Sequence, residues 1–140
     1  MSLVLDPSLA LGWYFEDERT GATEALLHQV AEHGAVVPGL WRLEIANGFQ
    51  MAIRRGRITS AYRDEALASL AQMSVLVDPH TDQYAWNETM LLSDRFNLTA
   101  YDAAYLELAR RRALPLATLD RKLRAAAIAL GLALSGTNAS

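Results

Sequence analysis

The chain has 140 residues, of which 51% are hydrophobic and 21% are charged. This length and composition are typical of one soluble globular domain, with residues 1–140 sharing a single core. The chain contains no cysteine, which excludes a disulfide framework and a thiolate metal site. The formal net charge is −3, so we do not expect the chain to bind nucleic acid through a generally basic surface.

No apolar run is long enough for a membrane helix, and the first residues lack a basic leader. We therefore expect a cytoplasmic protein that makes no membrane contact. The three histidines, His28, His33 and His80, do not have the spacing of metal ligands on one helical face. Zinc held by histidine is therefore not expected.

Short apolar runs alternate with longer helical patterns along the chain. Strands are predicted at residues 3–5, 35–37, 75–77, 115–118 and 132–134. Helices are predicted from Pro7 and at residues 23–33, 41–55, 59–73, 81–95, 99–112 and 121–130. Strands that alternate with helices need crossover connections, which predicts an α/β fold with a mostly parallel sheet covered on both faces.

Several patterns predict core packing. Apolar residues recur every four positions in the helix at 41–55. The helix at 59–73 is expected to turn one stripe of side chains inward: Tyr62, Ala66, Leu70 and Met73. The aromatic residues at 13–15 are expected in the core or at a partner interface, and stacking on unpaired bases is the alternative.

Four acidic residues are expected at one edge of this sheet: Asp6, Glu44, Asp102 and Asp120. The first and last follow predicted strands, and the other two lie in the first turns of predicted helices. The carboxyl ends of parallel strands meet at one edge, which is where ligands gather in such folds. The four carboxylates, which we call the acidic quartet, could therefore converge on one cleft.

Each acid also has a purely structural explanation. Asp6 and Asp120 precede helices and fit N-caps, and Thr99 with Asp102 has the spacing of a capping box. Glu44 would favour the positive end of its helix dipole. As a group, however, four close carboxylates would raise each other's pKa values. A bound cation would resolve this conflict, and an all-oxygen site prefers Mg²⁺ or Mn²⁺, which support hydrolysis.

The acids lie in four characteristic stretches, which follow one another over nearly the whole chain. They read VLDPS at 4–8, LEIAN at 43–47, LTAYDAAY at 98–105 and PLATLDRKL at 115–123. In these stretches and their order the chain resembles the PIN domain, and within it the VapC-type toxin ribonucleases of bacterial toxin–antitoxin pairs.

The resemblance implies a PIN-like three-layer sandwich with a mostly parallel, five-stranded sheet. It implies that the catalytic residues are Asp6, Glu44, Asp102 and Asp120. The Mg²⁺ or Mn²⁺ ligands would be Asp6, Asp102 and Asp120, while Glu44 positions or deprotonates the attacking water. Supporting positions would be Ser8, Asn47 and Thr118. Many relatives carry a further acid where this chain has Arg121 and Lys122, so we expect one tightly held ion, with another recruited by the RNA phosphate.

The cations at Arg121, Lys122 and Arg124 begin a predicted helix, where the helix dipole disfavours positive charge. We therefore expect them to contact RNA phosphates. Two other arginine clusters, at 54–57 and 110–112, end predicted helices, and their expected role is to complement the dipole.

The leading hypothesis is a Mg²⁺- or Mn²⁺-dependent endoribonuclease that cleaves structured RNA at a single-stranded loop. The resemblance implies a toxin that is inhibited by a cognate antitoxin protein and that forms a homodimer. The alternative is a catalytically inactive PIN-fold module that binds RNA or protein. Further alternatives are a related metal phosphatase or DNA flap nuclease, and a phosphoacceptor receiver domain. The receiver is disfavoured because Asp6 stands alone after the first strand.

Overall fold

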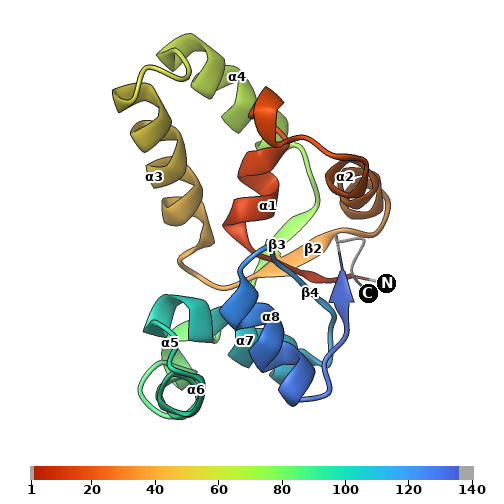
Figure 1. The fold of residues 1–140 in the computed structure, drawn as a ribbon, viewed down its shortest axis with the longest axis vertical. Helices are drawn as coiled ribbons and strands as arrows, with labels where there is room; N and C mark the ends of the chain where they lie inside the picture. Colours follow the sequence, from red (N-terminus) through yellow and green to blue (C-terminus); the bar gives the residue numbers. More distant parts are fainter. Residues whose placement is uncertain (1, 136–140) are drawn as a thin grey trace.

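The fold is an α/β arrangement around one parallel sheet, as predicted (Figure 1). A computed structural model describes residues 2–135. The sheet has five strands in the order β3-β2-β1-β4-β5, and every neighbouring pair is parallel. The strands are β1 (Val4–Leu5), β2 (Ala35–Val37), β3 (Val75–Val77), β4 (Leu116–Ala117) and β5 (Leu134–Ser135).

Helices cover both faces of this sheet. The first group is α1 (Pro7–Gly12), α2 (Gly21–His33), α3 (Trp41–Arg54) and α4 (Ser60–Ala71), with a 3₁₀ turn at Glu16–Glu18. The second group is α5 (Thr81–Tyr84), α6 (Glu88–Phe96), α7 (Ala100–Arg112) and α8 (Arg121–Ala129). Figure 1 shows α1, α3 and α4 on one side of the strands and α5 to α8 on the other. None of the described helices is long and apolar enough to cross a bilayer.

The strand order reverses direction at β1. From β1 the chain moves outward through β2 to β3, then crosses back to β4 and continues to β5. Right-handed crossovers in opposite directions place their helices on opposite faces of the sheet. The carboxyl ends of β1 and β4 therefore form a topological switch point, the position where open α/β sheets bind ligands.

The centre of the sheet is fully buried, whereas one edge strand is not. Leu3, Val4 and Leu5 have no exposed surface, and neither has Leu116 on the neighbouring strand. The aromatic residues Trp13 and Phe15 are also buried, as the core interpretation of residues 13–15 predicted. In β3, by contrast, Leu76 is 59% exposed because this strand has a neighbour on one side only.

Three local predictions differ from the structure. The helix expected at 81–95 is split into α5 and α6, because the Asn87 side chain accepts a hydrogen bond from the Glu88 backbone and starts a second helix. The last strand is Leu134–Ser135 rather than 132–134, because a turn with positive φ at Gly131 follows α8. Tyr62 is not buried: its ring reaches the surface and its hydroxyl donates to the Tyr14 carbonyl.

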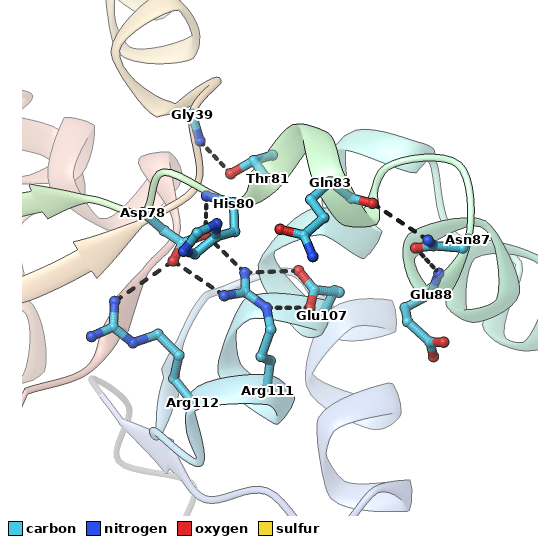
Figure 2. A network of polar contacts seen from close by, with 10 residues as sticks. All are labelled: Gly39, Asp78, His80, Thr81, Gln83, Asn87, Glu88, Glu107, Arg111 and Arg112. Atoms are coloured by element: carbon cyan, nitrogen blue, oxygen red, sulfur yellow. Dashed lines mark hydrogen bonds and ion pairs between the residues drawn. The ribbon is translucent and has the colours of Figure 1, made fainter.

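A buried ion-pair network fastens α7 to the end of β3 (Figure 2). Arg111 donates from Nη2 to Asp78 Oδ2 at 2.8 Å and from Nε to Glu107 Oε2 at 2.7 Å. Burial alone would raise the pKa of Asp78, but hydrogen bonds from Arg111 and the His80 backbone hold it below the usual range. Arg111 therefore does more than complement the helix dipole, since it forms ion pairs with two buried acids, and Arg112 adds a second cation near Asp78.

Candidate active site

Asp6 lies at the switch point, directly after β1, and is 7% exposed. It occupies the N-cap position of α1, yet its side chain makes no capping hydrogen bond. Its Oδ2 instead accepts from the Ser8 hydroxyl at 2.5 Å and from the Thr118 hydroxyl at 3.0 Å. The capping explanation of this acid is therefore wrong, and the carboxylate faces residues that follow β4.

Asp120 comes from the other side of the switch point. Its backbone N–H donates to the Thr118 hydroxyl at 3.1 Å, so one threonine connects Asp120 to the carboxylate of Asp6. The Asp120 side chain accepts from the Lys122 backbone N–H at 3.2 Å and caps α8. The capping explanation therefore holds for Asp120. The cap uses only Oδ1, so Oδ2 takes no part in it.

Glu44 reaches the site from the first turn of α3 and is held by a tyrosine of α7. The buried Tyr105 hydroxyl donates to Glu44 Oε1 at 2.6 Å. Burial and this bond both raise the pKa of the Tyr105 phenol, so it stays protonated and remains a donor. Burial also raises the pKa of Glu44, against the effect of the Tyr105 bond, with smaller contributions from Asp6 and Asp102.

Asp102 lies in the first turn of α7 and is partly buried. Its backbone N–H donates to the Thr99 hydroxyl at 3.1 Å, which caps the helix. Burial raises the pKa of Asp102, and the charge of Asp120 raises it further. The Thr99 cap thus fixes where α7 begins and so positions Asp102 in its first turn. The carboxylate of Asp102 is close enough to Asp120 for the two charges to interact.

The four acids influence one another although they come from distant parts of the sequence. Burial is the main reason that the pKa of Asp6 is raised, and the charges of Asp102 and Asp120 add to it. The hydroxyls of Ser8 and Thr118 only partly offset this effect. Within residues 2–135, no three histidine, aspartate or glutamate side chains are arranged closely enough to form a ready metal-ligand set.

The other predicted site residues have different surroundings. Ser8 and Thr118 contact Asp6 directly. Asn47 is exposed on α3, one turn after Glu44. Arg121 and Lys122 are exposed in the first turn of α8, and Arg124 is half-buried on the same helix. These cations are therefore near the end of β4, on the helix that Asp120 caps.

Sequence reasoning assigned no role to Tyr105. Tyr105 lies three residues after Asp102, so both side chains are on one face of α7. This spacing was the one indication in the sequence that Tyr105 is near the quartet. What the sequence did not reveal is that the phenol crosses to α3 and contacts Glu44. That contact depends on how two helices pack on opposite faces of the sheet.

Comparisons with known proteins agree with this architecture. The model of the PIN domain family matches residues 3–129. Ribonuclease VapC3 of Pyrobaculum aerophilum is 29% identical over 123 residues, which cover 88% of this chain and 92% of that protein. The crystal structure of PAE2754 from the same organism superposes with a TM-score of 0.66 at 25% identity, covering 90% of this chain and 84% of the other.

The family match extends over most of the chain and includes all four acids of the quartet. The parallel five-stranded sheet and the solved relative support the same assignment. Together with the ribonuclease relative, these findings support a nuclease of the PIN type. The chain belongs to the PIN domain family.

Proposed function

We propose that this protein is a Mg²⁺- or Mn²⁺-dependent endoribonuclease, the toxin of a toxin–antitoxin pair, which cleaves structured RNA at a single-stranded loop. The main support is the environment of Asp6. Its carboxylate is buried at the switch point, and the charges of Asp102 and Asp120 oppose its ionisation. Such an arrangement is costly unless a cation neutralises it.

The quartet supplies the type of ligand that a hard divalent cation prefers, because Mg²⁺ and Mn²⁺ favour carboxylate oxygens. Since no three of the described side chains already form a ligand set, the acids would have to move closer together or reach the ion through water. Asp6, Asp102 and Asp120 would hold the ion directly or through water. When bound, it would polarise a phosphoryl oxygen and lower the pKa of a coordinated water. Ser8 and Thr118 would keep the Asp6 carboxylate in place through the hydrogen bonds described above.

Glu44 would orient the attacking water and accept its proton. It is held at Oε1 by the Tyr105 hydroxyl, which leaves Oε2 for the water. Its raised pKa makes it a stronger base than an exposed glutamate. Asn47, one helical turn away on α3, would contribute a further polar contact at the entrance to the site.

The RNA backbone would approach the site over the first turn of α8. Arg121 and Lys122 are exposed there, and with Arg124 they would bind phosphates next to the scissile bond. The toxin role rests on the similarity to a ribonuclease named VapC3. A cognate antitoxin would then block the acidic cleft, and the toxin would form a homodimer.

The first prediction concerns cleavage itself. With Mg²⁺ or Mn²⁺, the purified protein should cut structured RNA within a single-stranded loop, and EDTA should abolish the reaction. Asp6→Asn and Asp102→Asn should each lower the rate by about a hundredfold or more, because the ion stabilises transition-state charge by several kcal/mol. Gel analysis of labelled RNA measures both effects.

The matched control is Asp94→Asn, which removes an exposed acid from α6 and should leave the rate unchanged. Cleavage that survives chelation and both quartet substitutions would reject the mechanism. DNA and small phosphate esters, offered in parallel, should be poor substrates. Preference for either of them would favour a flap nuclease or a phosphatase.

The toxin role predicts an effect on cell growth. Induced expression should arrest growth in a bacterial host, and co-expression of the protein encoded next to this gene should relieve the arrest. The Asp6→Asn variant, made at the same level, should not arrest growth. Normal growth of every tested host with the active protein would contradict the toxin assignment.

The raised pKa of Asp6 predicts how stability depends on pH without metal. The folded protein holds this proton more tightly than the unfolded chain does, so stability falls as pH rises through the range between the two pKa values. In EDTA at neutral pH, Asp6→Asn should therefore have the higher melting temperature. The difference should vanish at acidic pH, where the wild-type carboxyl is also neutral.

Adding Mg²⁺ in the same thermal scans provides the control. The ion should raise the melting temperature of the wild type, since it binds only the folded state, and should raise that of Asp6→Asn much less. Equal melting temperatures of both proteins at every pH would show that the ionised Asp6 carries no destabilising cost.

Tyr105→Phe should impair catalysis through Glu44 while leaving the fold intact. The variant removes one hydrogen bond to a charged group, so kcat should fall about tenfold with little change in KM. The acidic limb of the kcat–pH profile should move to higher pH, because the bond lowers the pKa of Glu44. Steady-state kinetics over a pH series measures both changes.

Tyr14→Phe is the comparison variant, because its hydroxyl bonds to Ser69 on α4 rather than to an acid of the quartet. It should leave kcat and the pH profile as in the wild type. A Tyr105→Phe enzyme with an unshifted profile and full kcat would mean that Glu44 needs no hydrogen bond from this tyrosine.

A further inference from the structure

Three large apolar side chains are exposed, each directly before a member of the acidic quartet in the sequence. They are Leu43, Tyr101 and Leu119, with exposed fractions of 76%, 67% and 48%. We call them the apolar rim. Leaving a large apolar side chain in water forgoes the stabilisation that burial would provide. Other large apolar side chains are also exposed, among them Trp86 and Leu91, but these three stand next to acids of the quartet and therefore belong to the surface of the candidate site.

Local geometry explains why these positions face outward. Consecutive Cα atoms are about 3.8 Å apart, and adjacent residues in a helical turn or a loop point in different directions. Glu44 and Asp102 are turned partly inward, so Leu43 and Tyr101 are turned to solvent. Leu119 stands between Thr118, which is buried, and Asp120, which is partly buried, and it projects outward for the same reason.

We propose that the apolar rim binds unpaired bases on either side of the scissile phosphate, with Tyr101 stacking on one of them as a specificity-determining residue. This inference rests on the proposed ribonuclease function and adds to it how a single strand is recognised. A phosphate at the quartet would have its flanking bases within reach of residues adjacent to the acids. An aromatic ring binds any base through its face.

The pattern of charge favours a nucleic acid over a protein as the occupant. The rim residues alternate with carboxylates, and Leu119 is followed after Asp120 by the exposed cations Arg121 and Lys122. Phosphates and bases alternate along a single strand, so the two cations of α8 would meet phosphates while the apolar side chains meet bases. The carboxylates would repel a phosphate unless a cation is bound between them. A protein interface would instead have a continuous apolar centre depleted of charge.

The rim also explains selection for single-stranded RNA. Bases inside a duplex are stacked on one another and paired, so their faces are not available to Tyr101. A loop offers unstacked bases without the cost of opening a helix. The three rim side chains would thus reject a duplex without any contact that depends on base identity.

The experiment compares three variants on a short single-stranded oligoribonucleotide and on copies that lack one base next to the cleavage site. We expect Tyr101→Ala to weaken binding and raise KM about tenfold, as loss of base stacking does. Tyr101→Phe keeps the ring and should bind as the wild type does. Removing the stacked base should weaken the wild type by a similar factor, but should not weaken Tyr101→Ala further.

Ile128→Ala is the matched control, because Ile128 is an exposed aliphatic residue in the last turn of α8, 64% exposed. It should leave affinity unchanged, whereas Leu119→Ala should weaken binding severalfold. Binding is measured by fluorescence anisotropy in the Glu44→Gln background, which slows cleavage of the probe. Circular dichroism melting verifies that each variant is folded.

The outcomes separate the inference from the proposed function. Suppose that RNA is cleaved but Tyr101→Ala has no effect, or that this substitution weakens binding equally for the intact and the base-free oligonucleotides. Either result would show that the apolar rim does not bind bases, and would leave the proposed nuclease function unaffected. Binding that depends on Tyr101 without any cleavage would support the rim and reject the nuclease. If Tyr101→Ala weakens only the complex with the co-expressed partner protein, the rim is a protein contact and the inference is wrong.

Discussion

The carboxylate of Asp6 is kept inside the protein at a place where the fold supplies further negative charge, and most features of the site depend on this conflict. The strand order reverses at β1, which brings the ends of β1 and β4 together and places Asp6 and Asp120 on opposite sides of Thr118. Helices α3 and α7 then add two more acids from opposite faces. A fold that concentrates like charges in this way is less stable until a ligand neutralises them.

Elsewhere in this protein, buried acids are stabilised by a direct ion pair. Asp78 and Glu107 are also buried acids, yet Arg111 bonds to both of them, and the pKa of Asp78 is lowered (Figure 2). At the quartet, Asp6 and Glu44 receive hydrogen bonds from hydroxyl groups, which carry no charge. Hydroxyls orient a carboxylate without neutralising its charge, which suits the proposed role of the quartet in holding a cation.

Much of the fold was predictable because its signals are local. The order of strands and helices follows from hydrophobic runs, and the caps at Thr59 and Thr99 were visible as single residues. The break between α5 and α6 was missed because a regular pattern at 81–95 conceals a cap formed by Asn87. The contact of Tyr105 with Glu44 was missed because it joins residues 61 positions apart. Only the tertiary fold, which places α3 and α7 on opposite faces of the sheet with these two side chains meeting between them, brings them together.

The first turn of α8 carries positive charge directly beside the acidic quartet. A helix dipole disfavours cations in the first turn, yet Arg121 and Lys122 stand there, directly after the acid that caps the helix. Neither residue gains from the helix dipole at that position, and the overall charge of −3 gives the protein no general affinity for polyanions. The two cations therefore create a local positive edge beside the acidic quartet. Under the proposed function, an approaching phosphate would be attracted to this positive edge before it reaches the carboxylates of the quartet.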